Sequence, residues 1–262
     1  MDIKSKDYQE HEIFERIEYF MEFYDFLSDN VMLFVSMGTK SIINIETYMF
    51  MSMKGTLDSI KCLLKIGRIN DAYALLRKFY DSIYINVYTT LYLQDNFDIK
   101  NFIVLKIQKW LEGAEQLPSH REISNYIRDS AALKNINAIL YRDKRYNKIR
   151  DICNDNTHYN FYQNVLLNDN RIYISNRIDH LNGLYKGITQ LMIMHVSYIF
   201  ILNDHYMSSS DYRDHLEVGM SAPKDSEYWV ASSVQEFFDS IIKKNRPDLA
   251  DLIKSTITMH LN

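Results

Sequence analysis

One polar segment contains residue types that can carry out acid–base chemistry. The stretch RDICNDNTHYN, residues 150 to 160, holds an arginine, two aspartates, three asparagines and a histidine around a single cysteine. His158 can take a proton from a ribose 2′-hydroxyl, and Arg150 can stabilise the charge that develops on the phosphate. Asn154 is a third candidate catalytic residue between them. Since Asn and Asp also favour turns, the alternative is a solvent-exposed turn at a helix end.

The spacing of this pair limits what it can do alone. On a regular helix an offset of eight residues leaves Arg150 and His158 about 80° apart around the axis. It also separates them by about 12 Å along the axis, which is long for two groups that share one phosphate.

Arg77 and Asp81 form a second constellation, one helical turn apart within LLRKFYDSIYINVY, residues 75 to 88. Tyr73 and Tyr84 share their flank. An arginine in such an apolar helix needs a partner, and Asp81 is well spaced to supply it. If His158 packs against this helix, the side chains form an internal polar site that can bind a small ligand such as a nucleotide. The alternative is an ion pair that only fixes the helix register.

These two segments resemble known helical proteins. RDICNDNTH is similar to the arginine–histidine motif of the HEPN superfamily, in which four to six mostly polar residues separate the two. Here seven residues separate Arg150 from His158. The resemblance implies a helical bundle, metal-independent cleavage of RNA, usually across a dimer interface, and a toxin–antitoxin or phage-defence setting. LLRKFYDSIYINVY also resembles a pattern in uncharacterised bacterial helical proteins, where a Leu-Leu-Arg run precedes an acid and a distant histidine segment.

A basic stretch is the best candidate for contact with nucleic acid. Its predicted phosphate-binding residues are Arg142, Lys144, Arg145 and Lys148. Tyr141 and Tyr146 interleave with them, which would suit stacking on single-stranded bases. The alternative is an ordinary solvated helix face. Because the net charge of the chain is −4, any nucleic-acid binding must depend on such a local patch.

No metal site or cofactor is predicted. The segment 195 to 215 is rich in His and Asp, but its histidines recur every ten residues, which spreads them around a helix. Only Asp211 and His215 have the spacing of metal ligands. Phosphate-binding glycine loops, dinucleotide fingerprints and zinc-protease motifs are absent from the sequence.

Composition and patterning predict an all-α fold. Glycine (7) and proline (3) are scarce, which is typical of long helices with short connections. Apolar residues at helical spacing predict a multi-helix bundle of about eight to ten helices. The expected helices cover residues 8–36, 40–66, 70–88, 99–113, two or three segments within 119–152, and then 177–206, 224–244 and 247–261. We expect residues 1–222 to form the bundle and 223–262 a C-terminal hairpin packed on it, as one structural unit.

Several residues predict where these helices begin and end. Gly38 and Gly67 suit the left-handed position after a helix, and Thr39 and Asn70 suit the caps of the helices that follow. A capping-box-like pattern starts at Ser208. Ser119 follows Pro118 at the start of a new segment, and Pro223 and Pro247 suit first helical turns.

The cellular setting expected from the sequence is the cytoplasm. The N-terminus lacks the apolar core of a signal peptide, and two cysteines are too few for a disulfide framework. The most apolar run, residues 187–202, is shorter than a bilayer span and contains His195, so a buried core helix is expected rather than a membrane helix. A composition rich in Ile, Asn, Lys and Tyr is typical of proteins from A·T-rich bacterial genomes.

Three functions remain open at this point. The leading hypothesis is a bacterial interaction or accessory module with a protein partner or a homo-oligomeric state, because 20 Tyr and 13 Phe favour interfaces. The first alternative is a HEPN-like endoribonuclease that acts on RNA through His158 with Arg150 or Arg77. The second is a nucleotide sensor built on the tyrosine-lined Arg77 site.

Overall fold

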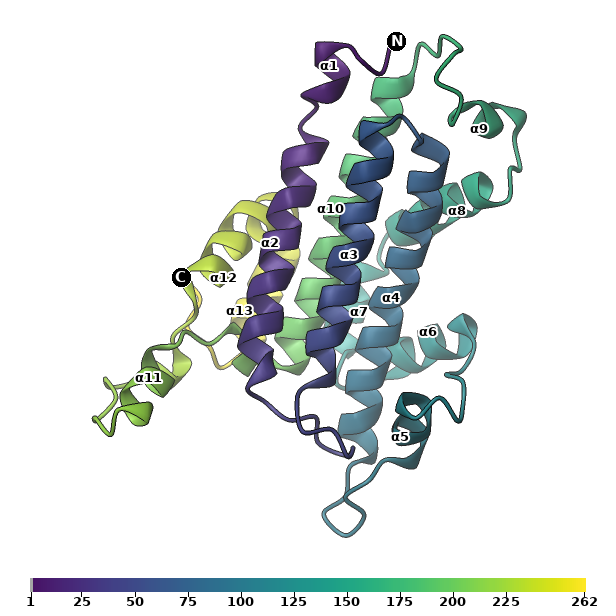
Figure 1. The fold of residues 1–262 in the computed structure, drawn as a ribbon. Coiled ribbons are helices and arrows are strands. Elements are labelled where there is room, and N and C mark those ends of the chain that lie inside the picture. The colour runs from purple at the N-terminus through teal and green to yellow at the C-terminus, as the bar shows by residue number, and fades with distance from the viewer. Residues whose placement is uncertain (1) are drawn as a thin grey trace.

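Four long helices form the centre of the molecule. The computed structural model describes residues 2–262, and their regular structure is entirely helical. α2 (Ile13–Met32), α3 (Ile45–Lys65), α4 (Ile69–Asn96) and α10 (Arg177–Leu202) run side by side (Figure 1). Each turns an apolar face inward, and α10 is buried along most of its length. The predicted core helix at 187–202 is therefore confirmed.

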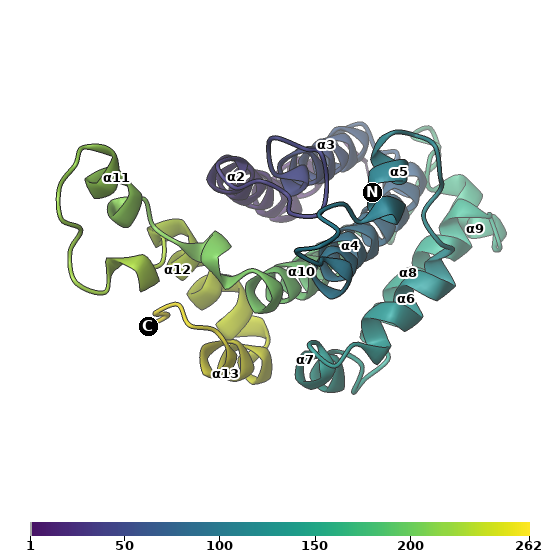
Figure 2. The ribbon, with the colours of Figure 1, turned by 90° about the horizontal axis from the view of Figure 1, so that it is seen from below.

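A second layer of shorter helices covers α4. α6 (His120–Asp129) and α8 (Arg145–Thr157) both pack on α4, and α7 (Lys134–Leu140) lies next to α6 (Figure 2). α5 (Leu105–Leu111) precedes this layer, and α9 (Tyr162–Leu166) follows α8 at its outer edge. The layer matters for function because α4, α6 and α8 carry most of the polar residues singled out above.

The C-terminal segment folds back on the bundle. α12 (Ser232–Phe237) continues directly into a π-helical turn, η3 (Phe238–Lys243), and α13 (Pro247–Thr256) packs against η3, α7 and α10. Before it, η1 (Asp204–Met207) packs on α10 and α2, and α11 (Asp211–Glu217) lies on an arm that extends from the bundle (Figure 1). η2 (Ser226–Tyr228) follows and contacts α11. A single turn, α1 (Lys6–Gln9), precedes α2.

The all-α bundle is confirmed, with more helices than the eight to ten expected, because several elements are only one or two turns long. Gly38 and Gly67 adopt φ of 81° and 75°, as turn glycines should. Ser119 caps α6 through a full capping box with Glu122. Pro247 occupies the first turn of α13.

Other predicted helix starts were wrong. Asn44, not Thr39, caps α3, because its side chain accepts from the Glu46 N–H. Asn70 lies inside α4, after its N-cap at Arg68. The pattern at Ser208 gives no capping box, since α11 begins at Asp211 without a side-chain cap.

The helices expected at 99–113 and 224–244 are shorter than predicted. α5 begins only at Leu105, after a turn closed by the bridge between Asp98 and Asn101. Pro223 starts no helix; it accepts from the backbone and hydroxyl of Ser226 in a loop, and α12 begins at Ser232. Within residues 2–262 no helix is long and apolar enough to cross a membrane.

Candidate functional site

The antiparallel packing of α8 on α4 sets the position of the candidate site. Near the start of α4, Asn70 Nδ2 donates to the carbonyl and side-chain oxygens of Asn156, at 3.0 and 3.1 Å. Two turns along α4, Arg77 Nε donates to Asn154 Oδ1 at 2.9 Å. Since the residue numbers of the two helices run in opposite directions, Arg150 lies further along α4, toward Asp81 and the start of α6.

Three charged or titratable side chains meet there. Arg77 forms an ion pair with Asp81, as the four-residue spacing predicted. His120, the first residue of α6, places Nε2 at 3.4 Å from Asp81 Oδ1. Their side chains are only partly buried, with 16% of Arg77, 25% of His120 and 36% of Asp81 exposed. The cluster is therefore partly exposed, although Arg77 Nη1, Asp81 Oδ1 and His120 Nε2 are themselves shielded from solvent.

Aromatic rings form one wall of this cluster. The His120 ring stacks on Tyr80, with centroids 5.8 Å apart, and its centroid lies 5.1 Å from that of Tyr84. The Arg77 guanidinium lies over the Tyr80 ring at 5.4 Å. Tyr80 donates to Tyr84, and the Tyr84 hydroxyl is 3.2 Å from that of Tyr141. These contacts hold the imidazole and the guanidinium in fixed positions.

The surroundings of His120 favour its neutral form. Burial lowers the pKa of His120, and the Arg150 and Arg77 guanidinium groups lower it further, while Asp81 opposes them. His120 is therefore a neutral imidazole near pH 7. Its Nε2 faces Asp81, and its Nδ1 makes no hydrogen bond within residues 2–262, so one ring nitrogen is left for an external partner.

Arg150 supplies a positive charge that the cluster does not neutralise. The side chain is partly buried, and its Nε is shielded from solvent without a hydrogen-bond partner. Among residues 2–262 no carboxylate forms an ion pair with it. Two guanidinium groups therefore accompany the single carboxylate of Asp81, and this surplus favours an anion.

Cys153 lies behind the cluster and does not take part in chemistry. It is fully buried, and burial raises the pKa of its thiol to about 12. A buried neutral thiol is a poor nucleophile. Its role is to pack α8 against the core.

The structure does not bring His158 to Arg77 and Asp81. His158 follows α8 as its C-cap residue and is exposed, and its side chain makes no hydrogen bond or ion pair within the described chain. The register explains this, because the end of α8 lies by Asn70, two turns before Arg77. Tyr159 then turns the chain away with φ of 50°. Arg150 and Asn154 join the Arg77 cluster, and His120 is the histidine that accompanies them.

The predicted ligand-binding tyrosines also separate. Tyr84 contacts His120, as described above. Tyr73 is buried and faces α10, where its hydroxyl lies 3.4 Å from Nδ1 and from the carbonyl oxygen of His180. Tyr73 is one turn before Arg77, so it reaches a different neighbour. His120 was missed because the sequence does not state which helix covers α4; the one local signal was the Ser119 cap before His120.

The basic stretch is only partly available to a ligand. Arg142, Lys144 and Lys148 are exposed and form no ion pair within residues 2–262. The Arg145 guanidinium is already occupied. It makes three hydrogen bonds to the Asp143 carboxylate through Nε and Nη2, and Nη1 donates to Gln190 Oε1 at 2.8 Å. Tyr146 is buried and therefore cannot stack on a base.

Residues 2–262 contain no group of three or more His, Cys, Asp or Glu side chains arranged to hold a metal ion. The pair with ligand spacing, Asp211 and His215, is joined instead through the backbone, since His215 Nδ1 lies 2.7 Å from the Asp211 carbonyl oxygen. His195 lies in the core and is described below.

Comparison of the chain with protein-family models, with curated proteins and with solved structures gives no significant match.

Proposed function

We propose that the cluster of Arg77, Asp81, His120 and Arg150 binds a phosphodiester of RNA and cleaves it without a metal. The observation that carries this proposal is a neutral histidine held beside a carboxylate at a partly exposed position, with two guanidinium groups near enough to lower its pKa. A general base must be neutral near the working pH, and a phosphate needs positive charge. The HEPN resemblance of RDICNDNTH suggests the same reaction and includes Arg150 and Asn154 of this cluster, whereas the histidine of that motif, His158, lies outside it.

In this reaction His120 Nδ1 takes the proton of a ribose 2′-hydroxyl. The 2′-oxygen forms a bond to phosphorus, and the bond from phosphorus to the 5′-oxygen breaks. The products are a 2′,3′-cyclic phosphate and a 5′-hydroxyl, whose proton comes from water or from the imidazolium. Arg150 and Arg77 stabilise the extra charge on the phosphate. Asp81 orients the ring through Nε2 and stabilises the imidazolium, so it acts as a positioning residue.

The test compares two histidines. Fluorescently labelled mixed-sequence RNA is incubated in EDTA with the wild-type protein and the His120→Ala, His158→Ala and Arg150→Ala variants. We expect cleavage to fall at least 100-fold in His120→Ala and Arg150→Ala and to stay within threefold of wild type in His158→Ala. His158 is the matched control because it is exposed and outside the cluster.

The contrary results are equally specific. Loss of cleavage in His158→Ala with full activity in His120→Ala would move the site to the motif itself and overturn the assignment of His120. If no variant cleaves RNA, binding is measured by fluorescence anisotropy. RNA binding that disappears in Arg150→Ala would leave an RNA-binding site without cleavage, whereas binding of mononucleotides alone, lost in Arg77→Ala, would favour a nucleotide sensor.

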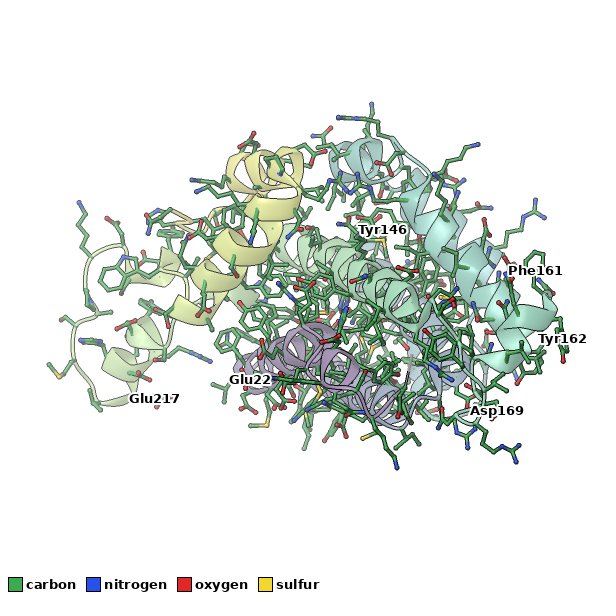
Figure 3. All side chains as sticks on the ribbon, turned by 90° about the horizontal axis from the view of Figure 1, so that it is seen from above. Glu22, Tyr146, Phe161, Tyr162, Asp169 and Glu217 are labelled. Atoms are coloured by element: carbon green, nitrogen blue, oxygen red, sulfur yellow. The ribbon has the colours of Figure 1, made fainter. Side chains whose placement is uncertain are left out.

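A second proposed function is that of an interaction module with a protein partner or a second copy of the chain. It rests on exposed aromatic rings after α8: Tyr159, Phe161 and Tyr162 are 51%, 54% and 78% exposed. Figure 3 shows Phe161 and Tyr162 at the outer edge of the molecule, pointing away from the bundle. Clustered exposed rings are typical of interfaces.

Light scattering after gel filtration tests this proposal. An oligomer that dissociates in a Phe161→Ser, Tyr162→Ser double variant supports it, and a monomeric wild-type protein would contradict self-association. A toxin–antitoxin or phage-defence setting is suggested by the HEPN resemblance alone.

A further inference from the structure

A cavity lies near the C-terminal end of α4, beyond the Arg77 cluster. It has a volume of about 520 Å³ and opens between loop 33–44, the start of α3, the end of α4 and η1. Its apolar wall includes Phe34, Met37, Leu93 and Phe97, and its polar wall includes Glu46, Asn203 and His205. This size suits a small organic ligand.

Glu46 is the ionisable group that dominates the polar wall. Its side chain is 93% shielded from solvent, since the residue is only 7% exposed. Thr90 Oγ1 and Asn86 Nδ2 donate to its Oε1 at 2.6 and 2.9 Å, and Asn203 Nδ2 lies 3.5 Å from Oε2. All of these donors are neutral. The Tyr206 hydroxyl is a further neutral hydrogen-bond partner of the carboxylate. Because the contact of Oε2 with Asn203 is long, Oε2 keeps capacity to accept a stronger hydrogen bond.

A chain of hydrogen bonds through the core orients dipoles toward this carboxylate. Asn86 donates through Nδ2 to Glu46, so its Oδ1 must accept from His195 Nε2, at 2.7 Å. The neutral His195 ring then accepts at Nδ1 from the Tyr24 hydroxyl, also at 2.7 Å. Every hydrogen in this series points toward Glu46. Burial raises the pKa of Glu46, while the hydrogen bonds from Thr90, Tyr206 and Asn86, the last of them aligned by this series, act in the opposite direction and favour the carboxylate.

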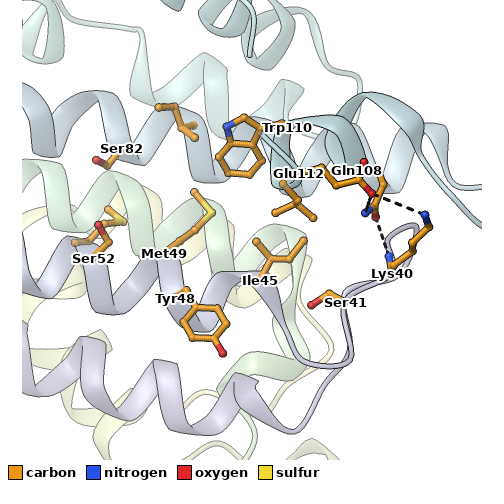
Figure 4. Close-up of a pocket in the computed structure, with 13 residues that line it drawn as sticks. Lys40, Ser41, Ile45, Tyr48, Met49, Ser52, Ser82, Gln108, Trp110 and Glu112 are labelled. Carbon is orange, nitrogen blue, oxygen red and sulfur yellow. Dashed lines mark hydrogen bonds and ion pairs between the residues drawn. The ribbon is translucent and has the colours of Figure 1, made fainter. Parts of the chain in front are cut away.

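No protein cation reaches Glu46 to balance that charge. Lysine and arginine are missing from the residues that line the cavity in the described chain. Lys40, from the same loop, turns into the neighbouring cavity, where Nζ lies 3.8 Å from Glu112 Oε1 (Figure 4). Ile45 lines both cavities and so separates them. Burial lowers the pKa of His205, which keeps that ring neutral.

Aromatic rings line the same cavity as the carboxylate. The His205 centroid lies 4.9 Å from that of Phe34 and 4.6 Å from that of Tyr206. The Phe34 and Tyr206 centroids are 5.8 Å apart. Aromatic faces attract a cation, and a desolvated carboxylate needs one.

We infer that this cavity binds an organic ammonium ion with an apolar tail. The ammonium group donates to Glu46 Oε2 near the rings of Phe34 and Tyr206, and the tail packs on Leu93 and Phe97. A buried carboxylate surrounded only by neutral donors repels anions. It attracts a cation more strongly than a neutral ligand, which has no charge to pair with it. On α4 the residues that line this cavity begin at Thr89, eight residues after Asp81, and no residue of the Arg77 cluster lines it. We therefore expect its occupation to be independent of RNA cleavage.

The experiment uses three probes that differ only in their head group: hexylammonium, 1-hexanol and hexanoate. Isothermal titration at pH 7.5 measures their affinities for the wild-type protein. We expect hexylammonium to bind at least tenfold more tightly than hexanol, and hexanoate to show no binding. In Glu46→Gln, which keeps the shape and the acceptor oxygen, we expect that tenfold preference to disappear. Met37→Trp provides a second variant, because Met37 lines the cavity and is 61% exposed, so a larger ring there fills the cavity without disturbing the core.

Equal affinities for hexylammonium and hexanol would overturn the inference, as would a preference for hexanoate. If hexylammonium binds equally well to Glu46→Gln and Met37→Trp, the ligand binds elsewhere on the protein, and the inference is again overturned. The comparison of probes on the wild-type protein stays decisive if Glu46→Gln does not fold. RNA cleavage is measured on the same samples and is expected to be unaffected by Glu46→Gln.

Discussion

At the scale of single residues, three histidines show how environment decides chemistry. His195 is completely buried between Tyr24 and Asn86, His120 is half-buried beside Asp81, and His158 is exposed. Only His120 combines a charged neighbour with access to solvent. His195 instead orders the hydrogen bonds that end at Glu46.

The burial of His195 predicts a pH-dependent stability. Burial lowers the pKa of His195 from 6.5 to about 3. Between these values the unfolded chain binds a proton that the folded protein does not, so stability rises with pH across this window and is lost as the pH falls below about 6.5. The contribution to the slope approaches about 1.4 kcal/mol per pH unit. We expect urea denaturation between pH 4.5 and 7 to show a smaller slope in His195→Gln than in wild type.

The exposed His158 provides the control for that measurement. His158→Gln should keep the wild-type slope, because the His158 side chain is exposed and makes no hydrogen bond or ion pair within the described chain. An unchanged slope in His195→Gln would mean that the buried ring is not the group that resists protonation.

At the scale of elements, the predictions that were confirmed depend only on residues close together in the sequence. The Arg77–Asp81 pair lies within one helix and formed as expected, and so did the Ser119 cap. Asn70 had the residue type of an N-cap, but its side chain is used to hold α8 through Asn156. A tertiary contact here outweighed the local preference.

Two glycines near each other in sequence should respond oppositely to alanine. Gly55 lies in the exposed middle of α3, and a Cβ there would meet no atom within 4 Å, so Gly55→Ala should stabilise the protein by about 0.5–1 kcal/mol. Gly67 has φ of 75°, and a Cβ there would approach Ile3 Cγ2 to 2.8 Å. Gly67→Ala should cost at least about 1 kcal/mol. Urea denaturation measures both; a stabilised Gly67→Ala would contradict the left-handed turn.

At the scale of the whole molecule, one buried arginine joins the C-terminal segment to the rest. Arg246 is 4% exposed and forms an ion pair with Asp248 at 2.9 Å. It also lies within 3.4 Å of the Tyr146 hydroxyl and the Ile139 carbonyl oxygen, which belong to α8 and α7. The last forty residues are thereby tied to the layer that carries the candidate site.

We expect Arg246→Ala to lower the free energy of unfolding by about 3 kcal/mol, because it leaves Asp248 and two buried acceptors without their donor. Urea denaturation measures this loss. We expect a single transition, because the C-terminal segment 223–262 is tied to the bundle and should unfold together with it. Arg142→Ala, at an exposed position, should change stability by less than about 0.5 kcal/mol. Two separate transitions in the wild-type protein would argue that residues 223–262 form an independent unit.

The sequence by itself determined that the chain is helical, that residues 187–202 form a buried helix and that Arg77 pairs with Asp81. These properties depend on residues within a few turns of one another, where periodicity and spacing act directly. Only the tertiary structure decided that His120 rather than His158 joins Arg77, and that Glu46, which reads as an ordinary acid in a first helical turn, faces a cavity at the end of a buried hydrogen-bond chain. Both depend on the register between helices, which is set by the packing of side chains far apart in the sequence, and no local pattern encodes that register.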